Sequence, residues 1–275
     1  MSRPSISTTP ARLLRDVADL ARQAADLVME VYARPWAPVR TKADASPVTE
    51  ADERAEAHIV PGLQALLPGV PVVAEEAVAA GGLPELGATP PARFWLVDPL
   101  DGTREFLARN GEFTVNIALV EAGHPVLGVV LAPAIGPAGV LYAGAAGQGA
   151  WRAEGTAAWQ VITVQAPPPQ GLTLVSSRSH GDDAALQAFL AGFLRGRPVA
   201  AHRTAGSSLK LCLLACGQAH LYPRLGRTME WDIAAGHAVL AAAGGQVCTL
   251  DGEPLRYGKP GFENPHFRAT AGLEP

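Results

Sequence analysis

The sequence predicts an α/β protein with an α+β first half and a regular α/β second half. Two amphipathic helical segments precede a series of apolar strands in the first half, and strand and helix patterns alternate after residue 170. Such an order favours helices that pack on sheets. The clearest linker signal in the chain is Ala166-Pro167-Pro168-Pro169. We therefore expect two domains, over residues 1–166 and 167–275.

The first half is expected to begin with a helix at Thr9-Pro10, because Thr is a good N-cap and Pro fits the first helical turn. Apolar residues recur at spacings of three and four as far as Val31, as on a buried helix face. After a loop over 35–48, Thr49 and Asp52 have the spacing of a capping box and predict a second helix. Apolar runs predict strands over 71–74, 93–98, 113–120 and 125–132, with weaker ones near 139–143 and 160–164.

The second half shows shorter apolar runs between helical patterns. Gly244-Gly245 ends the last helical pattern, since glycine is a common helix terminator. Strands are expected over 172–176, 219–223 and 246–250, and helices over 182–194, 206–216 and 231–243.

Composition excludes several classes of protein. The chain has 275 residues, 48% of them hydrophobic and 17% charged, and a net charge of −4. It therefore has no broad basic surface for nucleic acid. Three cysteines, Cys212, Cys216 and Cys248, suit core thiols in a reducing compartment better than a disulfide framework. No apolar run reaches the ~18 residues of a membrane span. We expect a cytoplasmic protein without stable membrane insertion. Peripheral association with the inner face of the cell membrane is compatible with this expectation. The sequence predicts no oligomeric state.

The most informative chemistry follows the apolar strand at 93–97. Asp98 comes directly after this strand, and Pro99 is expected to turn the chain so that Asp101 returns beside Asp98, with the Leu100 carbonyl between them. Three oxygen donors would then converge, as Mg²⁺ requires. The alternative interpretation is an acidic surface turn, which Asp-Gly sequences commonly form.

Further residues extend this pattern. Gly102 and Thr103 are expected to open a short helical turn whose free N–H groups would face a phosphate. The pair Glu75-Glu76 follows another apolar run, and of the two Glu76 is interpreted as a supporting or surface acid. Asp232 begins an Ala-rich helical segment, where its alternative role is to complement the helix dipole.

Together these blocks resemble the signature of the inositol monophosphatase-like, lithium-sensitive metal phosphatases. Residues 97–106 and 110–119 look like the CysQ-type branch, the 3'(2'),5'-bisphosphate nucleotidases, as do 177–180, 206–210 and 221–224. The resemblance covers roughly residues 40–265. It implies a layered αβαβα sandwich with the active site in a cleft between the two halves.

The resemblance also implies a role for each site residue. Two or three Mg²⁺ ions would be held by Glu75, Asp98, the Leu100 carbonyl, Asp101 and Asp232, with Asp98 bridging. Thr103 and Glu75 would orient the attacking water. Asp44 is the nearest candidate for a carboxylate that supports Thr103, although Ser46 occupies the position where some relatives carry that Asp.

The implied substrate is 3'-phosphoadenosine 5'-phosphate, which would lose its 3'-phosphate to give AMP. Its 5'-phosphate would be held by Ser207, Lys210 and Arg224, and its adenine would lie against His180. Taken alone, Lys210 also suits a solvated helix charge, and a lone His is usually structural. The expected substrate-binding residues are Gly102, Thr103, His180, Ser207, Lys210, Arg224 and Asp232.

Three alternatives accompany this prediction. The sulfated analogue, 3'-phosphoadenosine 5'-phosphosulfate, is a further candidate substrate. An inositol monophosphatase or a sugar-phosphate phosphatase would use the same metal site without needing Ser207, Lys210, Arg224 and His180 together. A non-catalytic nucleotide sensor would not require Thr103 as a water-positioning residue.

Overall fold

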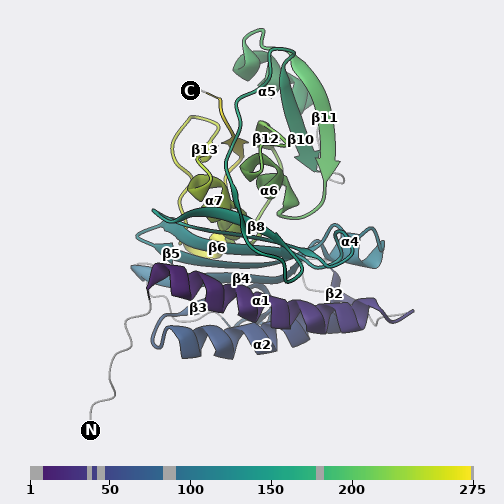
Figure 1. Ribbon diagram of the computed structural model, residues 1–275, viewed down its shortest axis with the longest axis vertical. Coiled ribbons are helices and arrows are strands. Elements are labelled where there is room, and N and C mark those ends of the chain that lie inside the picture. The colour runs from purple at the N-terminus through teal and green to yellow at the C-terminus, as the bar shows by residue number, and fades with distance from the viewer. Residues whose placement is uncertain (1–8, 36–38, 42–46, 83–90, 178–182, 274–275) are drawn as a thin grey trace.

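The computed structural model describes residues 9–35, 39–41, 47–82, 91–177 and 183–273. Its helices and sheets form five layers in the order helix, sheet, helix, sheet, helix (Figure 1). This confirms the expected αβαβα sandwich. Within the described part of the chain, no helix is both long enough and apolar enough to cross a membrane.

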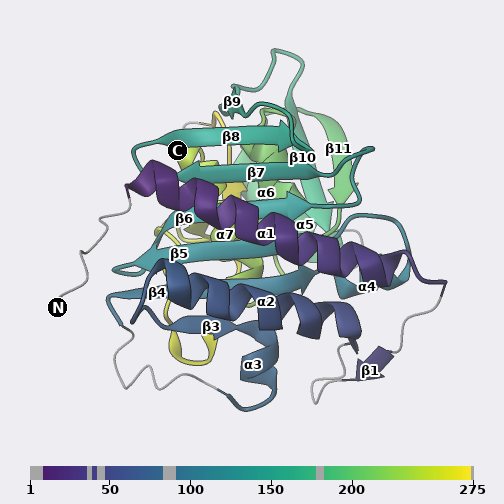
Figure 2. The same cartoon turned by 60° about the horizontal axis from the view of Figure 1, so that its bottom comes forward.

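The first layer consists of two helices on one face of the larger sheet, as Figure 2 shows. Helix α1 spans Pro10–Tyr32, and the Thr9 hydroxyl caps it by accepting the Arg12 N–H. Helix α2 spans Glu50–Leu66 and begins with the predicted capping box of Thr49 and Asp52. Both helices bury their apolar faces against the sheet, so the sequence prediction for this layer is confirmed.

The second layer is a seven-stranded sheet in sequential order from β3 to β9. Strands β3 and β4 pair in parallel, and all other neighbours are antiparallel. The sequence prediction missed β8, whose polar residues weaken the strand pattern. The bounds are β3 Val72–Ala74, β4 Arg93–Asp101, β5 Thr114–Glu121, β6 His124–Ala132, β7 Val140–Ala145, β8 Gly149–Glu154 and β9 Gln160–Ile162. Strands β1 (Val39–Thr41) and β2 (Pro47–Thr49) form a separate antiparallel pair.

The fourth layer is a mixed five-stranded sheet, in the order β11-β10-β12-β14-β13. It consists of β10 Leu172–Ser177, β11 Val199–Ala205, β12 Leu221–Arg224, β13 Gln246–Thr249 and β14 Phe267–Thr270. The sequence prediction missed β11 and β14. Strand β11 lies at the edge and is exposed over six of its seven residues, so it lacks an apolar pattern. Helix α5 (Asp183–Leu194) packs outside this sheet as the fifth layer.

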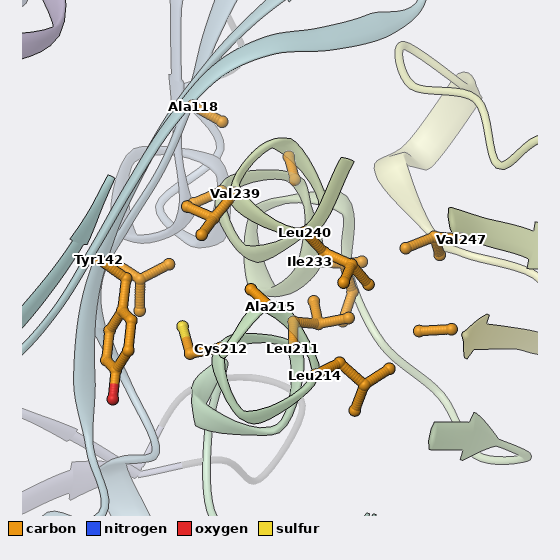
Figure 3. Close-up of a cluster of buried hydrophobic side chains, with 14 of the residues drawn as sticks. Ala118, Tyr142, Leu211, Cys212, Leu214, Ala215, Ile233, Val239, Leu240 and Val247 are labelled. Atoms are coloured by element: carbon orange, nitrogen blue, oxygen red, sulfur yellow. The ribbon is translucent and has the colours of Figure 1, made fainter. Parts of the chain in front are cut away.

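The middle layer contains α6 (Leu209–Ala215) and α7 (Glu230–Ala242). Figure 3 shows their side chains, including Cys212 and Val239, between Tyr142 of the larger sheet and Val247 of the smaller one. Helix α7 approaches β6 so closely that a Cβ on Gly128 would lie 2.3 Å from a backbone oxygen of the helix. One apolar core therefore joins the two sheets, and the proposed division into two domains stays a prediction.

Candidate active site

A β-bulge in β4 places two of the predicted carboxylates on one face of the larger sheet. Asp98 pairs with Asn116 of β5, whereas Asp101 pairs with Thr114, so β4 contains one extra residue between these positions. In a regular strand, residues three apart point to opposite faces. The extra residue places both carboxylates on the same face of the sheet. The expected turn at Pro99 is therefore a bulge, and β4 continues to Asp101 rather than ending at Asp98.

The end of β4 and the turn that follows it are shaped by their own hydrogen bonds. The Leu100 N–H donates to Asp98 Oδ1 at 3.0 Å, and Thr103 Oγ1 donates to the Leu100 carbonyl at 3.4 Å. Gly102 has φ +91°, and a Cβ there would lie 3.2 Å from the Glu112 carbonyl. It precedes the short helix α4 (Thr103–Leu107), so the predicted helical turn is confirmed.

The other two predicted carboxylates come from helix starts. Glu75 begins α3 (Glu75–Ala79), directly after β3. Asp232 lies in the first turn of α7, where its Oδ2 accepts the Met229 N–H at 2.8 Å. This bond fixes the Asp232 carboxylate at the N-terminal end of α7.

One cavity of about 290 Å³ brings residues of both halves together. Asp98 and Leu100 do not line it, and these residues are only 2% and 1% exposed. The predicted residues Asp44 and His180 lie outside the described part of the chain. Of the predicted site residues, the cavity is lined by Glu75, Asp101, Gly102, Thr103, Ser207, Lys210, Arg224 and Asp232.

The carboxylates in this cavity repel one another. Burial, together with the negative charge of Glu75, raises the pKa of Asp101 to about 6, against the opposing effect of Lys210. Burial and the charges of Asp101 and Glu75 likewise hold the pKa of Asp232 well above its ordinary value. Perturbed carboxylates of this kind are typical of functional sites. Among the described residues, no three His, Cys, Asp or Glu side chains already converge closely enough to hold a metal ion.

Two buried cations line the same cavity. Lys210 is 6% exposed, and its Nζ donates to the carbonyls of Ser207 and Ala205 at 2.6 and 3.3 Å. Arg224 is held by the Ser177 hydroxyl and by the Arg227 carbonyl, while its buried Nε has no hydrogen-bond partner among the described residues. Neither cation has a carboxylate within ion-pair distance in that part of the chain. Both are therefore suited to an anionic ligand.

Several residues that support the site were not predicted. The Ser177 hydroxyl accepts a hydrogen bond from Arg224, and the centre of the Tyr222 ring lies 5.5 Å from Lys210 Nζ. The side chains of Asn116 and Ser208 are hydrogen-bonded to each other next to Asp101. These residues lie inside apolar strands or in a Ser-Ser pair, so only their position in the fold distinguishes them. All four lie in the blocks that resemble the CysQ-type branch, and this motif context was the available signal.

A buried ion pair holds the start of α7. The Glu230 side chain is fully buried, and it accepts hydrogen bonds from the backbone of Gly258 and from both nitrogens of Lys259. Lys259 Nζ also donates to Asn264 Oδ1, while Asn264 Nδ2 donates to the Met229 carbonyl. The loop over 256–264 is thus fastened beneath the turn that carries Asp232.

Breaking this pair is expected to destabilise the protein. In Lys259→Met the Glu230 carboxylate would stay buried without its cation, and we expect the free energy of unfolding to fall by about 3 kcal/mol. Chemical denaturation measures this loss. As a control, Arg227→Met breaks the exposed pair with Glu263 and should cost less than about 1 kcal/mol. Equal losses in the two variants would contradict the role given to Lys259.

The fold and this cavity define a phosphatase of the inositol monophosphatase type, and the chain belongs to the inositol monophosphatase family, whose model matches residues 12–273. Within the family, it is 47% identical over 263 residues to 3'(2'),5'-bisphosphate nucleotidase CysQ of Escherichia coli (strain K12), covering 94% of this chain and 99% of the relative. The crystal structure of CysQ from Bacteroides thetaiotaomicron matches with a TM-score of 0.76 at 35% identity, over 98% of this chain and 99% of that one. Thermotoga maritima IMPase matches with a TM-score of 0.73 at 27% identity, over 96% and 93%.

Proposed function

We propose that this chain removes the 3'-phosphate of 3'-phosphoadenosine 5'-phosphate by hydrolysis, releasing AMP and phosphate. The observation that carries the proposal is the single cavity that joins carboxylates of the first half to two buried cations of the second half. A substrate with two phosphates needs both kinds of group at once. The CysQ relatives, which are similar over nearly their whole length, have the corresponding name.

The family is generally Mg²⁺-dependent, and the residues present fit this ion. The donors are all oxygens, which suits a hard cation, and a bound cation would stabilise the buried charge whose cost, with the repulsion from Glu75, raises the pKa of Asp101. We propose two or three ions, held by Glu75, Asp98, the Leu100 carbonyl, Asp101 and Asp232. When bound, Mg²⁺ supplies charge to the phosphoryl oxygens and lowers the pKa of water.

The protein's own groups have separate tasks in this proposal. Thr103 and Glu75 hold the attacking water, and Asp44 supports Thr103. The Gly102–Thr103 turn binds the 3'-phosphate beside Asp232. Ser207, Lys210 and Arg224 hold the 5'-phosphate, and His180 lies against the adenine. The orphaned Nε of Arg224 supports this assignment, because a phosphate oxygen would satisfy it.

A panel of phosphate esters tests the proposal. With Mg²⁺ present, phosphate release from 3'-phosphoadenosine 5'-phosphate should exceed release from inositol 1-phosphate and from sugar phosphates. The sulfated analogue, 3'-phosphoadenosine 5'-phosphosulfate, belongs in the same panel as a second candidate substrate. A clear preference for the inositol ester would support the alternative of an inositol monophosphatase. Binding of the nucleotide without any release would support a sensor.

Stability should depend on pH and on Mg²⁺ together. Because the pKa of Asp101 is raised to about 6 on folding, the folded protein binds this proton more tightly than the unfolded chain. The stabilisation is therefore present at low pH and is lost as the pH rises through about 6. We expect Mg²⁺ to raise the melting temperature more at about pH 7.5 than at about pH 5, since the ion binds the ionised form. An equal rise at both pH values, measured by calorimetry, would count against Asp101 as a ligand.

We also infer a cytoplasmic location, which the few free cysteines support. Cell fractionation tests it, and recovery with the inner membrane after gentle lysis would indicate the peripheral association considered above. The partner proposed is the small nucleotide alone.

A further inference from the structure

Two buried polar side chains connect the carboxylates that come from opposite halves of the chain. Asn116 lies in β5 and is 0% exposed, and Ser208 precedes α6 and is 2% exposed. Asn116 Nδ2 lies 3.2 Å from Asp101 Oδ2 and 2.9 Å from Ser208 Oγ. Ser208 Oγ in turn lies 2.6 Å from the backbone carbonyl of Asp232.

The directions of these hydrogen bonds are fixed by chemistry. Ser208 has one hydroxyl hydrogen, and a carbonyl can only accept, so that hydrogen goes to Asp232. The Ser208 oxygen must then accept from the amide of Asn116. The second amide hydrogen goes to the Asp101 carboxylate, which accepts as well. Both hydrogens of Asn116 Nδ2 are thus used. A continuous path of hydrogen bonds connects Asp101 of β4 with the first turn of α7.

Asn116 also contains an unsatisfied atom. Its Oδ1 is buried and has no hydrogen-bond partner among the described residues, and the hydroxyl of Thr114, two residues away on the same face, has none either. An unsatisfied buried polar group costs about 1–3 kcal/mol. A fully apolar contact would avoid this cost, so stability alone does not account for an amide at this position. Its place opposite Asp98 in the β4–β5 ladder relates it to the carboxylates.

We propose that Asn116 and Ser208 act as a positioning pair, which sets the separation of Asp101 and Asp232 and thereby the affinity of the site for Mg²⁺. This inference rests on the metal chemistry of the proposed function, but not on the identity of the substrate. Neither residue lines the cavity, so both act through the carboxylates. Groups that orient metal ligands in this way typically contribute about 10- to 100-fold to metal affinity.

A titration of the full-length protein with Mg²⁺, followed by its melting temperature and without any nucleotide, tests the pair. Ser208→Ala and Asn116→Leu should each weaken the apparent Mg²⁺ affinity, by about 10- to 100-fold. Because Asn116 and Ser208 are hydrogen-bonded to each other, the double variant should weaken the affinity by less than the two single effects combined. The matched control is Tyr257→Phe, which removes a buried hydrogen bond to His237 of α7 at 2.9 Å and should leave the Mg²⁺ affinity unchanged.

The outcomes separate this inference from the proposed function. If the variants lose stability as Tyr257→Phe does but keep the wild-type Mg²⁺ affinity, the pair is structural and the inference is wrong. A wild-type protein whose melting temperature does not respond to Mg²⁺ would overturn the metal chemistry and the pair together. A substrate panel that favours another ester would change the proposed function and leave the pair intact. If Asn116→Leu does not fold, Ser208→Ala alone decides the question.

Discussion

Asp101→Asn is expected to lower phosphate release by about 100- to 1,000-fold, the size of effect found when one charge-stabilising group is removed from an active site. The amide has the shape of the carboxylate and can still accept from Asn116, but it has no charge with which to bind a cation. The same change should make the metal-free protein more stable, because it removes a buried charge and its repulsion with Glu75 and Asp232. Activity assays and thermal denaturation without metal measure the two effects.

Opposite changes in activity and stability would identify Asp101 as a residue retained for function. Glu76→Gln is the matched control, since Glu76 is the neighbouring acid that is not expected to bind metal. It should keep activity within about threefold, because Glu76 does not line the cavity. Full phosphate release by Asp101→Asn would place the chemistry elsewhere.

Arg224→Met should raise the KM for 3'-phosphoadenosine 5'-phosphate by about 10- to 100-fold, as expected when a charged hydrogen bond worth about 1.5–3 kcal/mol is lost. Turnover of a substrate with a single phosphate, such as inositol 1-phosphate, should change little. The reason is that Arg224 offers an unpartnered Nε to the second phosphate in the proposed assignment. Steady-state kinetics on both esters give the comparison.

Arg197→Met removes the same charge from an exposed position and should leave both substrates unaffected. If Arg224→Met slows the two esters equally, Arg224 acts with the carboxylates rather than on the second phosphate. Lys210 makes a useful contrast, because its charge is the main effect that lowers the pKa of Asp101, whereas the charge of Arg224 is the smallest of the effects on the pKa of Asp232. A loss on both substrates is therefore expected for Lys210→Met.

The helices and most strands were predictable because their signals are local. Thr49 and Asp52 are three residues apart, and the buried face of α1 is a regular spacing of apolar side chains. Strand β11 was not predictable, since an exposed edge strand has no apolar pattern. The residues of the site were identified by their order in three separated blocks. Their convergence on one cavity depends on how β4, α3, α6 and α7 pack.

The sequence by itself determined the chemical inventory of this protein: oxygen donors after an apolar strand, Thr103 as the residue proposed to position water, and cations in the second half. These follow from residue types at short spacings. The tertiary structure determined how these groups are positioned relative to one another. One extra residue in β4 turns Asp98 and Asp101 to the same face, and the hydrogen bonds of Asn116 and Ser208 link that face to α7. Strand register and contacts between distant segments depend on packing across the whole core, which no local pattern encodes.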